Sequence, residues 1–161
     1  MLEVLYSTGV RRLELIALQL QDLDYERSVM MVRQGKGKKD RLLPIGKRAL
    51  QWLEKYLNEV RPELSTQLGE QTLFLSGYGD ALNRDVVSRM VRRYIEQADV
   101  GRSGSCHLLR HSMATHMLEN GADVRYVQEM LGHAQLETTQ IYTQVTIKKL
   151  QQVHTMTHPA K

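Results

Sequence analysis

The length and composition of the chain are those of one folded domain. It has 161 residues, of which 42% are hydrophobic and 25% are charged, and this balance excludes a disordered or collagen-like protein. The length supports one hydrophobic core and is short for two full domains. The single cysteine, Cys106, excludes an internal disulfide and suits a reducing compartment. Because there is neither an apolar run of about 18 residues nor a secretory leader, we expect a cytoplasmic protein with no membrane partner.

The positive charge of the chain is concentrated in one segment. The net charge is +4, but residues 27–48 alone hold 8 basic residues and 1 acidic residue, which gives this segment a charge of +7. A solvated lysine-rich loop and a contact with a polyanion such as nucleic acid both explain such a segment.

Two short helices are predicted at the N-terminal end. Apolar residues from Leu2 to Tyr6, followed by Gly9, predict a helix that ends near this glycine. The next segment, residues 11–20, has apolar residues at helical spacing and predicts a second helix. The side chains expected to form its buried stripe are Leu13, Ile16, Ala17 and Leu20.

A β-hairpin is predicted between residues 28 and 45. Two short apolar runs, at 28–34 and 41–45, flank the glycine-containing turn GKGKKD. The turn carries Lys36, Lys38 and Lys39. Because proline cannot donate to a strand ladder, Pro44 places the second strand at an edge or at its own end.

Helices are predicted over most of the remaining chain. Their expected ranges are 47–60, 83–98, 107–120 and 124–131, with a further helix around Tyr142. Pro62 is expected to close the first of them, and the run at 72–77 is expected to be a brief strand or a connector. The side chains expected to face inward in the second of them are Val86, Val87, Met90, Val91, Tyr94 and Ile95. The predicted fold class is therefore α+β, mostly helical, with a small antiparallel sheet.

The segment HLLRH carries the first candidate chemistry. His107 and Arg110 are three residues apart at the start of a predicted helix, so both side chains project to one face beside its positive end. This corner suits an anion. The alternative is structural, with His107 capping the helix and Arg110 paired to a carboxylate.

A zinc site and a cysteine nucleophile are both disfavoured. Cys106, His107, His111, His116 and His133 are near one another in sequence, but the glutamate of an HExxH motif and a second cysteine are missing. His116 lies roughly 140° around the helix from His111. Adjacent residues such as Cys106 and His107 seldom face each other on regular structure, which disfavours a nucleophile and base pair.

Five segments, taken together and in order, resemble the tyrosine site-specific recombinases, the family of phage integrases and Xer-type recombinases. The segments are TGVRRLEL, GKGKKDRLLP, HLLRH, LGH and IYT, and the resemblance covers essentially the whole chain. It implies a catalytic set that consists of Arg11, Lys36, His107, Arg110, His133 and Tyr142, supported by Glu14.

The resemblance implies cleavage and rejoining of DNA through a 3′-phosphotyrosine intermediate, without metal, ATP or another cofactor. Planar guanidinium groups suit the extra negative charge of a pentavalent phosphate, so Arg11 and Arg110 are expected to stabilise it, with Glu14 holding Arg11. A phenol is almost wholly protonated at pH 7, so the nucleophile Tyr142 needs a base, and His107 is our candidate.

The other members of the set assist the leaving group and the DNA backbone. Lys36 is the candidate acid for the 5′-oxygen, with Lys38 and Lys39 as alternatives, and His133 is expected to donate a hydrogen bond to a phosphate oxygen. Lys38, Lys39 and Arg41 are the expected DNA-binding residues. Arg12 is unusual, because relatives commonly have a smaller or apolar residue after the first catalytic arginine. It is either a surface residue or an additional phosphate contact.

The resemblance also implies double-stranded DNA as partner and a homotetramer assembled on it. We expect residues 1–161 to be the catalytic domain, with the N-terminal core-binding domain of relatives absent. The apolar stripe of Ile147, Leu150 and Val153 packs either on a neighbouring protomer or on its own core. Two further readings are a type IB topoisomerase, which LGH and IYT disfavour, and a non-catalytic DNA-binding remnant, which the intact catalytic set disfavours.

Overall fold

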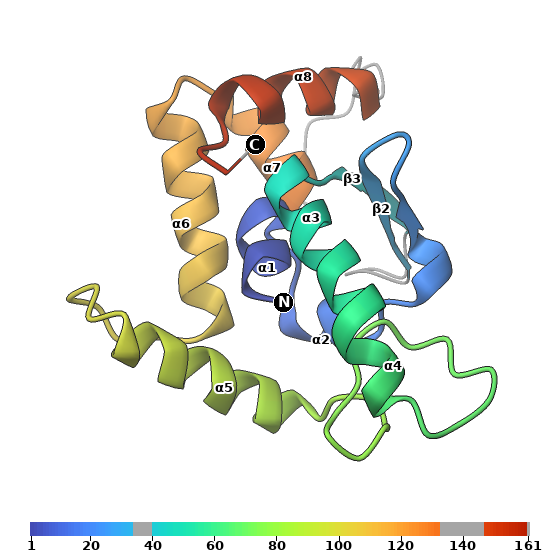
Figure 1. Ribbon diagram of the computed structural model, residues 1–161. Helices are drawn as coiled ribbons and strands as arrows, with labels where there is room; N and C mark the ends of the chain where they lie inside the picture. Colours follow the sequence, from blue (N-terminus) through green and yellow to red (C-terminus); the bar gives the residue numbers. More distant parts are fainter. Residues whose placement is uncertain (34–39, 133–146, 161) are drawn as a thin grey trace.

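The computed structural model describes residues 1–33, 40–132 and 147–160, and it is a mostly helical domain with one small sheet (Figure 1). This arrangement confirms the predicted fold class. In chain order the elements are α1 (Leu2–Thr8), α2 (Arg12–Ile16), η1 (Leu20–Asp22), β1 (Leu23–Asp24), β2 (Val29–Val32), β3 (Arg41–Pro44), α3 (Lys47–Lys55), η2 (Tyr56–Val60), α4 (Arg61–Leu64), α5 (Arg84–Gln97), α6 (Cys106–Glu119), α7 (Val124–Leu131) and α8 (Ile147–Thr157). None of the helices in the described ranges is long and apolar enough to cross a membrane.

The predicted hairpin is present as two strands of a three-stranded antiparallel sheet. The strand order is β1-β2-β3, and β2 pairs with β3 from Val29 opposite Pro44 to Val32 opposite Arg41. Pro44 ends the edge strand β3, where its missing N–H costs no ladder hydrogen bond. Arg41 begins this strand, five residues after Lys36 in the sequence.

Helix α1 lies at the centre of the domain, where it packs against α6 and α3 (Figure 1). Val4 and Leu5 are buried on it. The helix ends as predicted at Gly9, which has a φ of 63° and donates its N–H to the carbonyl of Leu5. Residues with a Cβ rarely adopt this left-handed conformation. A Cβ at Gly9 would also overlap the terminal methyl of the buried Met113.

Gly9→Ala is therefore expected to destabilise the domain more than the same change at an open left-handed glycine. Gly101, with a φ of 67° and no neighbouring atom within 4 Å of an added Cβ, is the matched control. The strained backbone should lower the free energy of unfolding of each variant by about 1 kcal/mol. The overlap with Met113 should lower that of Gly9→Ala by about 1 kcal/mol more. Urea denaturation of both variants measures this difference, and equal losses would contradict it.

The predicted helix at 11–20 is wrong in length and partly wrong in its buried face, since Ile16 and Leu20 pack against the core but Leu13 and Ala17 do not. Helix α2 ends at Ile16, and η1 begins only at Leu20. Leu13 is 60% exposed, whereas Leu15 and Leu18 are buried. The helix is short because Leu18 pairs instead with the distant connector, its carbonyl accepting a hydrogen bond from the N–H of Leu73. The face that turns inward also carries Glu14.

Two other predictions about the helices also need correction. Pro62 does not close the helix that begins at Lys47, because the π-helical turn η2 places this proline in the first turn of α4, where its missing N–H is not needed. In α5, Val86 and Tyr94 are exposed while Val87, Val91 and Ile95 are buried. The buried stripe of this helix is therefore narrower than predicted.

In the single chain, helix α8 packs on its own domain, which is one of the two positions predicted for its apolar stripe. It contacts β3, α6 and α7, and Leu150 lies in the main core with Ile147 and Val153 packed against it. His154 is buried as well, and its Nε2 donates to the carbonyl oxygen of Ser7 over 2.9 Å. Burial lowers the pKa of His154 to about 4, so this ring is neutral at pH 7.

Candidate active site

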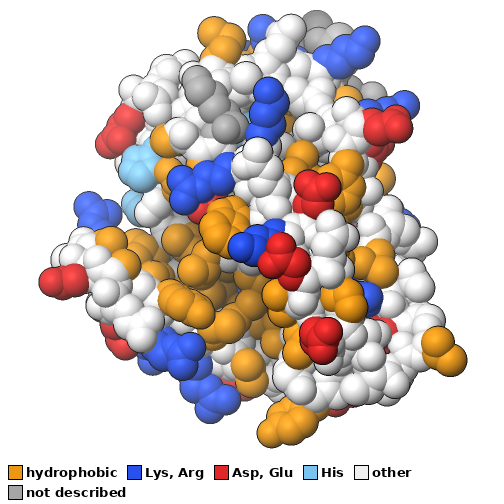
Figure 2. Space-filling model, viewed as in Figure 1, with side chains coloured by type: hydrophobic (Ala, Val, Ile, Leu, Met, Phe, Trp, Pro, Cys, Tyr) orange, Lys and Arg blue, Asp and Glu red, His pale blue; other side chains and the backbone are white. Residues whose placement is uncertain are grey.

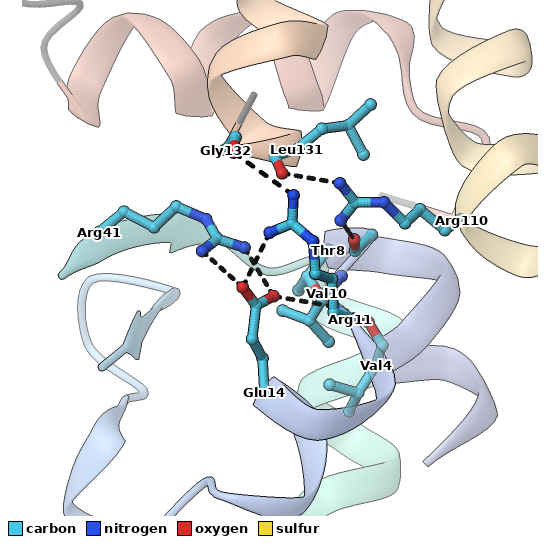
Figure 3. Close-up of polar contacts among 10 residues, drawn as sticks. Val4, Thr8, Val10, Arg11, Glu14, Arg41, Arg110, Leu131 and Gly132 are labelled. Carbon is cyan, nitrogen blue, oxygen red and sulfur yellow. Dashed lines mark hydrogen bonds and ion pairs between the residues drawn. The ribbon is translucent and has the colours of Figure 1, made fainter. Parts of the chain in front are cut away.

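The carboxylate of Glu14 is the centre of the candidate site (Figure 3). Glu14 lies in the first turn of α2, and its side chain is only 7% exposed. Its Oε2 accepts the backbone N–H of Arg11 at 2.8 Å, and its Oε1 accepts Nη1 of the same residue at 3.0 Å. A buried carboxylate needs such partners. The predicted pairing of Glu14 with Arg11 is confirmed.

A second arginine reaches the same carboxylate from the sheet. Arg41, at the start of β3, places Nη1 at 2.9 Å from Glu14 Oε1 and Nη2 at 2.8 Å from Oε2. This is the bidentate geometry in which arginine binds carboxylates most strongly. The Arg41 side chain is 14% exposed. Its guanidinium, which we expected to contact DNA, lies against Glu14 in this structure.

The third arginine of the site, Arg110, comes from α6 and reaches the end of α7 (Figure 3). Its Nη1 donates to the carbonyl of Gly9, and its Nη2 donates to the carbonyl of Leu131 at 2.7 Å. Arg11 Nη2 lies 3.4 Å from the carbonyl of Gly132. Guanidinium groups suit the carbonyl-rich, negative end of a helix. Both predicted catalytic arginines therefore reach the last two residues before His133 in the sequence.

The electrostatics of this arginine cluster, formed by Arg11, Arg41 and Arg110 around Glu14, favour an anion. Burial, together with the positive charges of Arg11 and Arg41, lowers the pKa of Arg110 to about 10 against the opposing effect of Glu14. Burial alone would raise the pKa of Glu14, but hydrogen bonds from Arg41 and Arg11 outweigh it and lower the value to about 2. Arg11 and Arg41 bind the carboxylate of Glu14, and Arg110 feels the charge of all three groups. Three positive charges thus have one negative charge among them, and a bound phosphate would relieve their repulsion.

Glu14→Gln is expected to lower the free energy of unfolding by about 2 kcal/mol at pH 7, because it leaves two partly buried arginines without their counter-charge while solvent still screens part of the effect. The pKa of Glu14 falls from an ordinary 4.5 to about 2 on folding. The stabilisation is therefore complete above the unfolded value and is lost as the pH falls towards 2.

Urea denaturation at a series of pH values measures this dependence. The difference between the wild-type protein and Glu14→Gln should be constant above about pH 6 and shrink between about pH 5 and pH 2. The exposed Glu54, changed to glutamine, is the control. A Glu14→Gln difference that is the same at pH 3 and pH 7 would contradict the assignment.

Two hollows on the surface differ in their chemistry. One, of about 380 Å³, lies between α2, α5 and the start of α6 and is lined by Arg12, Arg89, Arg92 and His107 among others. The other, of about 520 Å³, is mainly apolar and lies between α1, α5 and α6, where Figure 2 shows hydrophobic side chains gathered in a depression. The first hollow is the one that suits a phosphate backbone.

The structure also places two residues whose roles the sequence left open. Arg12 Nη1 donates to the hydroxyl of Ser88, so this arginine joins α2 to α5 at the rim of the basic hollow. His107 is exposed in the first turn of α6, on the same rim. The positions of the other predicted site residues lie outside the described ranges, and these residues are Lys36, Lys38, Lys39, His133 and Tyr142.

The described residues contain no group of three or more His, Cys, Asp or Glu side chains that could hold a metal ion. Cys106 is a buried free thiol at the start of α6.

The family profile and the curated relatives that match this chain all belong to one family. Residues 1–149 match the profile of the phage integrase family. The tyrosine recombinase XerC 2 of Ralstonia nicotianae is 53% identical over 161 residues, which cover 100% of this chain and 46% of the relative. The tyrosine recombinase XerD of Staphylococcus epidermidis is 42% identical over 159 residues, or 99% of this chain and 54% of the relative. The chain thus spans about half the length of the curated relatives it matches.

Solved structures agree with the sequence relatives. The crystal structure of XerA recombinase superposes with a TM-score of 0.75 at 37% identity, covering 95% of this chain and 55% of that one. The XerH site-specific recombinase, in a pre-cleavage complex with its difH substrate, superposes with a TM-score of 0.71 at 29% identity over 96% of this chain and 45% of that one.

Proposed function

Because this chain belongs to the phage integrase family, we propose that it is the catalytic domain of a site-specific DNA recombinase that cleaves and rejoins DNA strands. The observation that carries the proposal is the convergence of Arg11, the residue before α2, and Arg110, from α6, on the carbonyl end of α7. Their guanidinium groups come from different elements but donate to the carbonyls of two neighbouring residues, Gly132 and Leu131. This arrangement suits a single phosphate with two non-bridging oxygens.

The proposed chemistry uses the catalytic set that the sequence predicts. Tyr142 attacks the scissile phosphorus and becomes linked to the 3′-phosphate, while the 5′-oxygen leaves. His107 takes the phenolic proton, Lys36 protonates the leaving oxygen, and His133 donates a hydrogen bond to a phosphate oxygen. A 5′-hydroxyl of the partner strand then reverses the reaction. Because one phosphoester replaces another at each step, no ATP is consumed.

The proposed partner is double-stranded DNA that carries a recombination site, bound by four copies of the protein in the cytoplasm. The XerH relative bound to its difH substrate supports DNA as partner. Within the protein, the basic hollow lined by Arg12 and His107 supports a phosphate contact, and Lys38 and Lys39 add positive charge to the sequence between β2 and β3.

A nicked suicide substrate tests the proposal. DNA that carries a recombination site of an Xer relative, with a nick that lets the short cleaved end diffuse away, should trap the protein as a covalent complex on a denaturing gel. The experiment is run with the chain itself and with the chain fused to the N-terminal half of the Ralstonia relative. If no covalent band forms in either format, the chain is a DNA-binding remnant and the proposal is wrong.

Lys36→Ala is expected to slow cleavage of ordinary DNA about a hundredfold, because the leaving 5′-oxygen loses its acid. A substrate with sulfur at the 5′-bridging position should restore the rate, since a thiolate leaves without protonation. The measurement is the single-turnover cleavage rate on both substrates, with Lys38→Ala and Lys39→Ala as matched controls. Failure of the sulfur substrate to rescue Lys36→Ala would remove this lysine from the acid role.

A further inference from the structure

Arg41 is the member of the arginine cluster that comes from the sheet rather than from a helix. It begins β3 and stands five residues after Lys36 in the sequence. Both of its terminal nitrogens lie on the carboxylate of Glu14, at 2.9 and 2.8 Å, and its side chain is mostly buried. The second arginine on this carboxylate, Arg11, uses only one side-chain nitrogen there.

Each oxygen of Glu14 therefore has two donors, and Arg41 supplies one of each pair. Oε1 accepts Nη1 of Arg11 and Nη1 of Arg41, and Oε2 accepts the backbone N–H of Arg11 and Nη2 of Arg41. A forked donor fixes both the position and the plane of a carboxylate, which a single ammonium group cannot do. The orientation of the Arg11 guanidinium thus depends on Arg41 through Glu14.

The other side of Arg41 faces the end of α7. A Cβ added at Gly132 would lie 3.1 Å from both Cζ and Nε of Arg41, so the guanidinium lies close against the backbone of this glycine. Arg41 Nε is buried and has no hydrogen-bond partner within the described part of the chain. Arg41 is thus enclosed between Glu14 and the residue that precedes His133.

We propose that Arg41 is a positioning residue for DNA cleavage, which fixes the Arg11 guanidinium through Glu14 and joins strand β3 to the end of α7. This inference rests on the proposed recombinase function. It gives Arg41 a role that differs from the direct contact with DNA expected from the sequence. A phosphate contact would act on DNA affinity, whereas a positioning residue acts on the rate of cleavage after the DNA is bound.

The test compares Arg41→Gln and Arg41→Lys with the wild-type protein in the suicide-substrate assay. At saturating DNA, Arg41→Gln should cleave about tenfold more slowly because Arg11 is misplaced, and Arg41→Lys should recover only part of this loss because it restores the charge but not the fork. The dissociation constant for DNA and its salt dependence should stay within twofold of wild type for both variants. Weaker DNA binding with a smaller salt slope and an unchanged saturating rate would instead assign Arg41 to a phosphate contact and overturn the proposal.

Two further measurements connect the effect to Glu14 and Arg11. In a Glu14→Gln background, Arg41→Gln should cause little additional loss of rate, because the carboxylate through which it acts is already gone. The ¹⁵N relaxation of the Arg11 Nε–H group in the DNA-free protein should show a more mobile side chain in Arg41→Gln. Additive rate losses, or an unchanged Arg11 side chain, would contradict the positioning role.

The outcomes separate this inference from the function on which it rests. A wild-type protein that forms no covalent complex overturns the recombinase proposal. A wild-type protein that cleaves DNA, together with an Arg41→Gln variant of normal rate, overturns only the role of Arg41. If Arg41→Gln does not fold, Arg41→Lys decides by the same rate and affinity measurements, and a normal rate for Arg41→Lys overturns the role.

Discussion

Tyr142→Phe is expected to abolish the covalent protein–DNA complex completely. The variant removes one oxygen atom and leaves the rest of the side chain in place, so it deletes the nucleophile with little change in shape. No other group of the site takes over, because the arginines carry no nucleophilic atom and the reaction needs an oxygen to form the phosphoester. The measurement is the amount of covalent band formed on the nicked suicide substrate.

A second tyrosine provides the matched control for this variant. Tyr78 is 86% exposed on the connector after η2 and α4, and Tyr78→Phe should form the covalent complex in wild-type amount. DNA binding by Tyr142→Phe should also stay at the wild-type level, since the cationic groups are unchanged. A covalent band of normal intensity from Tyr142→Phe would contradict the assignment of the nucleophile.

Arg110→Ala is expected to slow DNA cleavage about a thousandfold, the upper end of the effect of removing one preorganised donor from a developing anion. Arg110 donates with two nitrogens to carbonyls of two separate segments, Gly9 and Leu131, and these contacts hold its guanidinium in a fixed direction. Arg110→Lys should recover only a small part of the rate, because one ammonium group cannot contact two carbonyls and a phosphate in this geometry.

The control for Arg110 is an arginine that pairs at the surface. Arg48 lies on α3, is 61% exposed and pairs with Glu3, so Arg48→Ala should cleave at the wild-type rate. The single-turnover rate at saturating DNA is the quantity to compare, because it separates the chemical step from weaker binding. An Arg110→Ala rate within threefold of wild type would contradict the proposed stabilisation of the phosphate.

The sequence predicted those helices and strands whose ends are set by residues close to them in the chain. The hairpin was readable because two short apolar runs flank a glycine-containing turn, and the end of α1 was readable from Gly9. The end of helix α2 could not be predicted, because Leu18 pairs with Leu73, a partner more than fifty residues away in the sequence. The π-turn before Pro62 was not predicted either, and none of its residues is fully buried.

The same distinction holds for the candidate site. The pair of Arg11 and Glu14 could be predicted, because three residues separate them on one helical turn. The pair of Arg41 and Glu14 could not, because it joins a strand to a helix across 27 residues. Similarly, nothing in the sequence indicates that Arg110 donates to the carbonyls of Gly9 and Leu131, which are brought together only by the packing of α1 against α6 and of α6 against α7.

The most direct test of the central claim is to locate the DNA on the protein. After reaction with the nicked suicide substrate, the covalent complex is digested with nuclease and trypsin, and the remaining nucleotide-bearing peptide is sequenced by mass spectrometry. We predict a 3′-phosphonucleotide on the hydroxyl of Tyr142 and on no other residue. An adduct on a different side chain, or a digest with no nucleotide-bearing peptide, would contradict strand cleavage through this tyrosine.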